Sequence, residues 1–314
     1  FCSNSCQRTI LEFSENSKHV TGNRCEKGEI LDEDKDVVRE KLRKTALRMK
    51  SIADLPEMRE RLIVKEFVQT EHFAKTQIIG IPRSLEFWDS LPFWKAFFNT
   101  LGYRVIVSSP STPVLFESAL QSVSSDTICL PAKLAHGHVH DLIEKKVDRI
   151  FHPLMMKGLL ENSTANASWM CPVIQGYSEV VRIHDDPEGK HGIQYDKPAF
   201  QWDSVKARDR QILKYARSAL GEKKSDVKRA IEAADEALRL FRQMLVDEGE
   251  KTLAALEPGE FAVVMAGRPY HNDSFINHDV AKHFRRLGIP VLDLDSLPGL
   301  AQVDLGIFMM ETNN

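Results

Sequence analysis

Short apolar runs that alternate with amphipathic stretches constrain the fold of this chain most strongly. Several of the runs end at Pro or Gly, and the stretches between them carry their apolar residues on one side of a helix. Strands that alternate with helices at this spacing are typical of a parallel sheet covered by helices. We therefore predict an α/β protein with a parallel, doubly wound (Rossmann or flavodoxin-like) sheet. The expected strands are residues 77–81, 103–107, 127–130, 149–151 and 171–174, and the expected helices are residues 85–101, 113–122 and 132–146.

The remaining pattern divides the chain into four expected segments. Residues 1–72 form a short Cys-rich segment followed by helices, and residues 73–183 form the first α/β domain. Residues 184–258 form a helical connection, irregular over its first part, with Ser225 as a candidate N-cap of its long second helix. Residues 259–314 begin a second α/β unit, which we expect to be incomplete because one strand-helix-strand unit is too small to bury a core.

Composition excludes some classes of partner and of location. The 314 residues carry a net charge of −3, which gives no reason to expect nucleic acid or an anionic membrane as partner. No apolar run reaches the roughly 18 residues that a membrane span requires. The 5 cysteines are odd in number, and nothing indicates secretion, so we expect a reducing, cytoplasmic location. Association into a homo-oligomer stays open.

Two cysteines, Cys129 and Cys171, stand beside a proline where a strand is expected to end. In open α/β sheets, ligands bind outside the carboxyl ends of the strands. Thiolates are soft ligands that select zinc, copper(I) or iron–sulfur clusters. A buried Cys that packs as a small hydrophobe is the competing interpretation. The residues alone leave both interpretations of Cys129 open, and two sulfurs do not complete a cluster.

Three histidines follow Cys129 at alternate positions. His136 and His140 share one face of the expected helix, and His138 points away. Zinc hydrolases with this spacing carry a Glu after the first His, but Gly137 stands there. We favour a role as polar donors near the start of a helix, and a metal-dependent hydrolase is the weaker alternative.

The N-terminal cysteines Cys2, Cys6 and Cys25 predict a metal site of their own. Three thiols and one further ligand make a tetrahedral zinc site or hold a cubane. His19 is a candidate fourth ligand within the chain. At the other end, Arg268 follows an expected strand and is a candidate for holding a carboxylate or phosphate, with a loop salt bridge as the alternative.

Several motifs together resemble one family. They are residues 1–9 (FCSNSCQRT), 22–28 (GNRCEKG), 79–83 (IGIPR), 93–95 (FWK), 129–138 (CLPAKLAHGH), 171–172 (CP) and 267–271 (GRPYH). In this order they resemble the central region of the large acyl-CoA dehydratase activase-related proteins. That region is similar to the iron–sulfur subunits of 2-hydroxyacyl-CoA dehydratases and to double-cubane cluster proteins.

The resemblance implies a [4Fe-4S] or related cluster, ligated by Cys129 and Cys171. Lys133, His136 and Arg268 would then lie around the ligands. It also implies an electron supplied by an ATP-dependent activase module, usually in the same polypeptide, and it leaves an acyl-CoA substrate open. A third cysteine ligand is expected beyond Asn314, so we expect this chain to be part of a longer protein. The alternative function is a non-catalytic α/β module, stabilised by zinc at the N-terminal cysteines, that docks a partner.

Overall fold

The computed structural model describes residues 7, 9–13, 18–22, 35–68, 73–159 and 168–300, which form two compact units, residues 1–51 and 52–314. In the first unit, β1 (Thr9–Glu12) pairs antiparallel with β2 (Lys18–Thr21), and α1 (Lys35–Ser51) follows. Cys2, Cys6 and Cys25 lie outside the described residues, so the metal site expected there stays a prediction.

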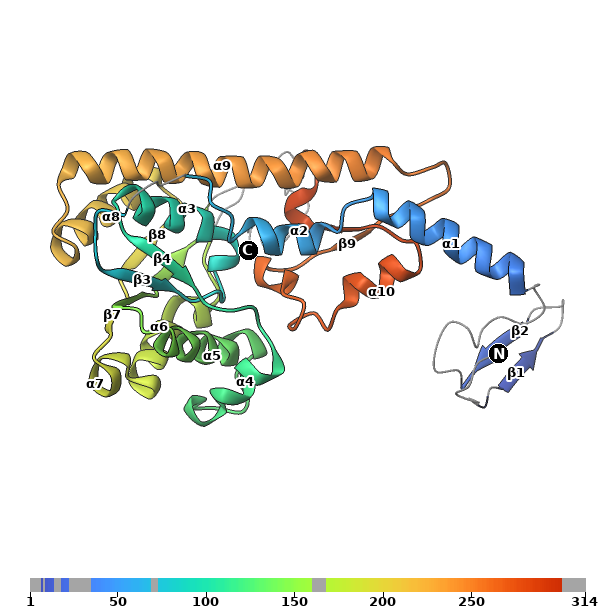
Figure 1. Cartoon of the computed structure of the whole chain (residues 1–314), viewed down its shortest axis with the longest axis horizontal. Helices are drawn as coiled ribbons and strands as arrows, with labels where there is room; N and C mark the ends of the chain where they lie inside the picture. Colours follow the sequence, from blue (N-terminus) through green and yellow to red (C-terminus); the bar gives the residue numbers. More distant parts are fainter. Residues whose placement is uncertain are drawn as a thin grey trace. The chain divides into compact units, whose positions relative to one another are not determined.

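A parallel sheet organises the second unit and confirms the expected α/β class. Its 4 strands are β3 (Ile78–Ile81), β4 (Arg104–Val107), β5 (Arg149–Phe151) and β7 (Gln194–Asp196), in the order β4-β3-β5-β7 (Figure 1). All neighbours in this order pair in parallel. The chain therefore leaves β3 toward one side of the sheet and later returns to pair β5 on the other side.

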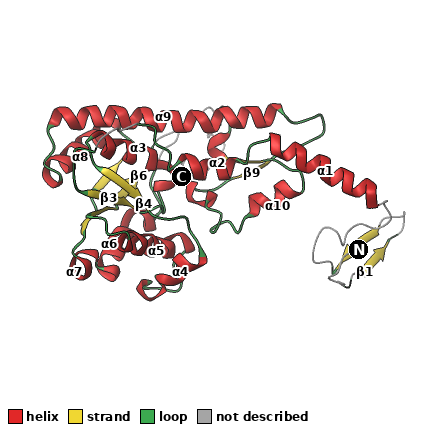
Figure 2. Ribbon diagram, in the orientation of Figure 1, coloured by secondary structure: helices red, strands yellow, loops and turns green. Residues whose placement is uncertain are grey.

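Helices cover both faces of this sheet. α3 (Phe87–Thr100) lies on the opposite face from α5 (Leu130–Glu144) and α6 (Pro172–Asp185), as Figures 1 and 2 show. The smaller connecting elements are α4 (Pro113–Ser118), η2 (Leu120–Ser122), β6 (Leu154–Lys157), α7 (Pro187–His191) and β8 (Ala199–Gln201), of which β6 and β8 pair in parallel. This arrangement places loops and helix starts at the carboxyl edge of the sheet.

The core of the unit forms around α3, nearly all of whose residues are buried. Trp94 on α3 meets Phe151 of β5 and Phe200 of β8 with ring centroids 4.6 and 5.0 Å apart. On its outer side α3 packs along α9 (Lys224–Ala254), which also contacts α8 (Val205–Ala219). Aromatic packing of this kind stabilises a core beyond the area it buries.

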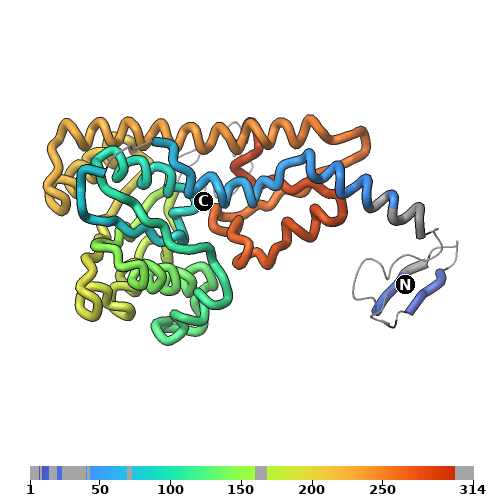
Figure 3. The backbone as a smooth tube through the Cα atoms, in the orientation of Figure 1, coloured from blue at the N-terminus to red at the C-terminus, as the bar shows by residue number. Residues whose placement is uncertain are grey.

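A second, smaller α/β element follows α9. β9 (Val263–Met265) and β10 (Val291–Asp293) pair in parallel, with η3 (Pro269–Asn272) and α10 (Val280–Arg286) between them and η4 (Leu294–Ser296) after them. α2 (Leu55–Leu62) contacts β10 and α9 from the other end of the sequence (Figure 3). No helix in the described part of the chain has both the length and the hydropathy needed to cross a bilayer.

Two of the predicted strands are wrong. Residues 127–129 form a turn, and Pro172 begins a helix, so that Cys129 and Cys171 are N-caps rather than strand ends. Proline is well suited to the first helical turn, where its missing N–H has no intrahelical acceptor. Lys133 Nζ donates to the carbonyl of Asp126 at 2.8 Å and ties the preceding turn to α5.

The prediction of an irregular connection over residues 184–202 is also wrong, because this segment contains α7, β7 and β8. The predicted N-cap is one more error, since α9 starts at Lys224 and its N-cap is Lys223, which leaves Ser225 in the first turn. In the second α/β unit, α10 begins only at Val280, after a turn in which His278 and Asp279 have positive φ.

Candidate functional site

The first candidate site is the place where α5 and α6 begin. Cys129 and Cys171 occupy the N-caps of these helices in extended backbone conformations, and the two helices pack against each other. His138, in the middle of α5, forms a hydrogen bond with Ser108, the residue that directly follows β4. The first turns of α5 therefore extend beyond the carboxyl edge of the sheet. The Cys129 thiol is exposed there, and the Cys171 thiol is half-buried.

Tyr270 of η3 connects the two cysteines. Burial raises the pKa of Tyr270 to about 12, Arg268 lowers it, and the charges of Cys171 and Cys129 both raise it further. Both sulfurs therefore lie within electrostatic reach of one hydroxyl group. Ser111, in the loop after β4, donates a hydrogen bond of 2.5 Å to Asp273 and holds the segment after Tyr270 against the carboxyl edge.

A buried histidine–aspartate network joins α5 to α6 behind Cys129. Asp185 accepts hydrogen bonds from His136 Nδ1 at 2.6 Å and from His140 Nε2 at 2.8 Å. Although burial opposes it, these two histidines hold the pKa of Asp185 well below its usual range. His136 Nε2 then accepts from the Tyr177 hydroxyl at 3.0 Å, so neither ring nitrogen of His136 is left for a metal ion. The preference for a donor role is consistent with this geometry.

Tyr177 extends the network toward the first cysteine. Burial raises the pKa of Tyr177 to about 12, with further contributions from Cys129 and Asp185. The order Asp185, His136, Tyr177, Cys129 therefore runs from the interface between the helices to the exposed thiol. Residue spacing predicted that His136 and His140 share a face, but the aspartate that receives both of them lies 45 residues further along than His140.

A buried acid near the carboxyl end of β3 was missed in the sequence. Glu86 directly precedes α3, is only 4 % exposed, and has two carboxyl oxygens without a hydrogen-bond partner among the described residues. Burial raises the pKa of Glu86 to about 8. Leu85 before it has a φ of 50°, which is strained for a side chain of this kind. A lone Glu beside the apolar start of a helix was the only signal for it.

Two neutral histidines lie near the same edge. His138 Nδ1 and Nε2 lie 2.9 and 3.2 Å from the hydroxyls of Ser108 and Ser111. His152, after β5, lies 2.7 Å from the Tyr195 hydroxyl. Burial lowers the pKa of each histidine to about 3, with Arg83 adding to the effect at His138 and His136 adding to it at His152. Both side chains are therefore uncharged at neutral pH.

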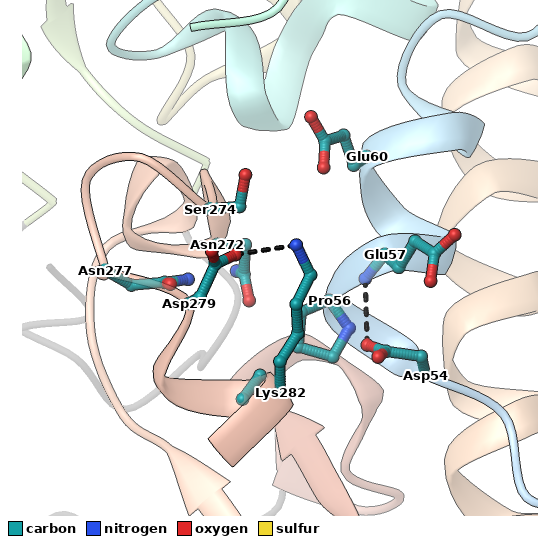
Figure 4. Close-up of a pocket in the computed structure, with 10 residues that line it drawn as sticks. Asp54, Pro56, Glu57, Glu60, Asn272, Ser274, Asn277, Asp279 and Lys282 are labelled. Carbon is teal, nitrogen blue, oxygen red and sulfur yellow. Dashed lines mark hydrogen bonds and ion pairs between the residues drawn. The ribbon is translucent and has the colours of Figure 1, made fainter. Parts of the chain in front are cut away.

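Two hollows lie beside the second α/β element. The first, of about 270 Å³, is lined by Asp54, Glu57 and Glu60 of the α2 region and by Lys282 and Asp279 across from them (Figure 4). The second, of about 240 Å³, lies at the end of β9 and is lined by Met265, Ala266, Gly267, Arg268, His271, Asn272 and Asn277. Arg268 is thus placed beside Tyr270, but also at a separate hollow.

The four-stranded parallel sheet and the helices that cover it define an α/β protein, in which two cysteines start neighbouring helices. The family described as the CoA enzyme activase uncharacterised domain (DUF2229) matches residues 78–297, which is more than half of the chain. The chain belongs to this family. Comparisons with curated proteins and with solved structures gave no match.

Proposed function

We propose that this chain is part of an iron–sulfur redox protein related to 2-hydroxyacyl-CoA dehydratase subunits. Cys129 and Cys171 would supply two thiolate ligands to a [4Fe-4S] or related cluster. The observation that carries the proposal is that both cysteines stand at the starts of helices that pack against each other. Membership in a family associated with CoA enzyme activases supports it.

The described side chains fit only part of such a ligand set. Among the residues that the structure describes, no group of three or more His, Cys, Asp or Glu is arranged to hold a metal ion. Cubane clusters are held mainly by cysteine thiolates, commonly four. Further ligands would therefore come from residues outside the described part.

The chain's own residues would orient and insulate the two sulfurs. The positive ends of α5 and α6 favour negative charge at their N-caps. The Tyr270 hydroxyl stays protonated at neutral pH and is able to donate a hydrogen bond toward a thiolate, whereas the Tyr177 hydroxyl donates its proton to His136. His136 holds Tyr177, and Lys133 holds the turn before Cys129.

A bound cluster of this kind would take up low-potential electrons, with reactivity tuned by hydrogen bonds to its sulfurs. The electron would come from an ATP-dependent activase module, and an acyl-CoA is the candidate substrate.

Anaerobic reconstitution tests this proposal directly. The protein at its full natural length is incubated with Fe²⁺ and sulfide, desalted, and analysed for iron, acid-labile sulfide and visible absorbance. We expect about four irons per chain for a cubane, with broad absorbance in the visible range. Cys129→Ser and Cys171→Ser should each lose most of the iron, because each removes a ligand.

Cys25→Ser is the matched control, since it removes a cysteine from the N-terminal set only. Iron that persists in Cys129→Ser and Cys171→Ser but disappears in Cys25→Ser would contradict the proposal. One zinc per chain in aerobically purified protein, unchanged by the Cys129 and Cys171 substitutions, would instead support the zinc-stabilised module.

A further inference from the structure

The hollow at the end of β9 has the properties of a small-molecule site separate from the cysteines. Its volume is about 240 Å³. It lies at the carboxyl end of a parallel strand, which is where α/β elements bind ligands. Among the residues that the structure describes, no Asp or Glu lines it, whereas Asp54, Glu57, Glu60 and Asp279 line the neighbouring hollow.

Arg268 brings an uncompensated positive charge to this hollow. Its guanidinium forms no ion pair with any carboxylate of the described residues, unlike the buried Arg59 and Arg149. An arginine presents its N–H groups in a planar fork that matches the two oxygens of a carboxylate or phosphate. The loop salt bridge considered as the alternative for Arg268 does not form within the described part of the chain.

The His271 ring adds a hydrogen-bond donor, because its tautomer is fixed by a contact with the backbone. Its Nδ1 accepts the backbone N–H of Arg268 at 3.0 Å, so that in the neutral ring the proton is on Nε2. Burial and the nearby Arg268 lower the pKa of His271, which favours this neutral form. The ring folds back over Gly267, where an added Cβ would lie 2.6 Å from Nδ1. A side chain at position 267 would therefore displace the His271 ring.

Two amides that line both this hollow and the neighbouring acidic one carry unused acceptors. Asn272 donates to the carbonyl of Pro269 at 3.1 Å, and Asn277 donates to the carbonyl of His271 at 3.0 Å. The Oδ1 atoms of both are buried and accept no hydrogen bond from a described residue. Asn272 is only 7 % exposed, so an unused acceptor there is costly. A ligand that both accepts from Arg268 and donates to these oxygens would satisfy the site.

We propose that the hollow formed by Gly267, Arg268, His271, Asn272 and Asn277 binds a small oxyanion that carries its own hydroxyl group. Hydrogen phosphate, which has an O–H, and a hydroxycarboxylate both have this chemistry. The oxyanion lies on Arg268 and His271, and the hydroxyl donates to the asparagine oxygens. The proposal does not depend on the iron–sulfur cluster, because none of these residues is one of its expected ligands.

Isothermal titration of the metal-free protein with three probes tests the proposal. Inorganic phosphate and glycolate should bind, and acetate, which lacks the hydroxyl donor, should bind at least several-fold more weakly. Arg268→Gln should weaken phosphate and glycolate binding by about tenfold or more, the usual effect of losing a charge-assisted pair. Arg268→Lys should retain part of the affinity, because it keeps the charge but not the fork.

Lys282→Gln is the matched control, because it removes the cation that lines the neighbouring hollow instead. It should leave binding of all three probes unchanged. Circular dichroism confirms that each variant is folded, and only folded variants are compared. No measurable binding of phosphate and glycolate, equal binding of acetate and glycolate, or an equal loss in Arg268→Gln and Lys282→Gln would each overturn the proposal.

Discussion

At the scale of single residues, the carboxyl edge of the sheet carries several titratable groups that are kept uncharged by burial. Glu86 has a pKa of about 8, and His138 and His152 have pKa values of about 3, in each case mainly through burial. At pH 7 all three are therefore mostly neutral. The strained backbone at Leu85 lies beside this acid, which is the kind of local strain that structures retain at functional sites.

Glu86 gives the first prediction, which concerns stability against pH. Its folded-state pKa of about 8 lies above the unfolded value of 4.5, so the folded state binds more protons between these pH values. The stability that neutral Glu86 contributes is complete below about pH 4.5 and is lost as the pH rises through 8, at up to about 1.4 kcal/mol per pH unit. Urea unfolding of wild type and Glu86→Gln from pH 5 to pH 9 should show wild type falling relative to the variant.

Glu117→Gln serves as the control, because Glu117 is an exposed side chain on α4. Its difference from wild type should stay nearly constant over this pH range. A Glu86→Gln difference that is equally constant would show that the Glu86 carboxyl ionises alike in both states.

At the scale of elements, α4 lies unusually close to α5, the helix that Cys129 precedes. Gly137, between the histidines of α5, allows this approach: an added Cβ would lie 2.5 Å from the carbonyl oxygen of Leu115 on α4. Packing against α4 therefore explains why position 137, where zinc hydrolases carry a glutamate, is a glycine. Gly176 on α6 has no atom within 4 Å of such a Cβ.

These two glycines make a matched pair for the second prediction. Gly137→Ala should destabilise the protein by about 1–3 kcal/mol, because α4 has to move away from α5. Gly176→Ala should stabilise it by about 0.5–1 kcal/mol, because alanine is the better helix former and the space is open. Urea unfolding measures both, and a stabilising Gly137→Ala would show that the helices are packed less closely than described.

At the scale of the whole second unit, one buried arginine joins elements from both ends of the sequence. Arg59 on α2 is fully buried and contacts Asp293 at the end of β10 at 2.9 Å and the carbonyl of Trp88 on α3 at 3.2 Å. It also lies 5.6 Å from the ring centre of Phe241 on α9. The smaller α/β element is therefore fastened to the main sheet through α2 and α9.

The third prediction follows from this position. Arg59→Leu should lower the free energy of unfolding by about 3–5 kcal/mol, because Asp293 would be left as a buried charge without its partner. Arg61→Leu, on the exposed side of the same helix, should change it by about 0.5 kcal/mol or less. Thermal and urea unfolding compare the two. Equal effects would mean that the Arg59 network contributes no more than a surface charge.

The strands that were predicted correctly are those whose residues are apolar in themselves. Residues 78–81 and 149–151 are hydrophobic runs, or nearly so, and their burial needs no particular partner. β7 was missed because Gln194, Tyr195 and Asp196 do not form an apolar run. Asp196 is buried only because Arg149 and the Tyr215 hydroxyl bind it at distances of 2.5–2.6 Å. Such partners are brought together by the fold and leave no local pattern.

The cysteines show the same division. Their position beside proline marked them as candidates, yet the strand expected before Cys129 is absent, since residues 127–129 form a turn that Lys133 holds. The pairing of His136 and His140 on one face followed from helical spacing. Spacing could not show that Asp185 accepts hydrogen bonds from both histidines. Nor could it show that Glu86 is buried without a hydrogen-bond partner among the described residues.

Local apolar periodicity was sufficient to establish the α/β class, most of the helices and the two cysteines worth testing, because each of these depends on residues close together in the chain. Strand order, the hollow at Arg268 and the charge state of buried acids and histidines were decided by packing between distant segments. Burial and hydrogen-bond partners set those properties, and both arise only when the chain has folded.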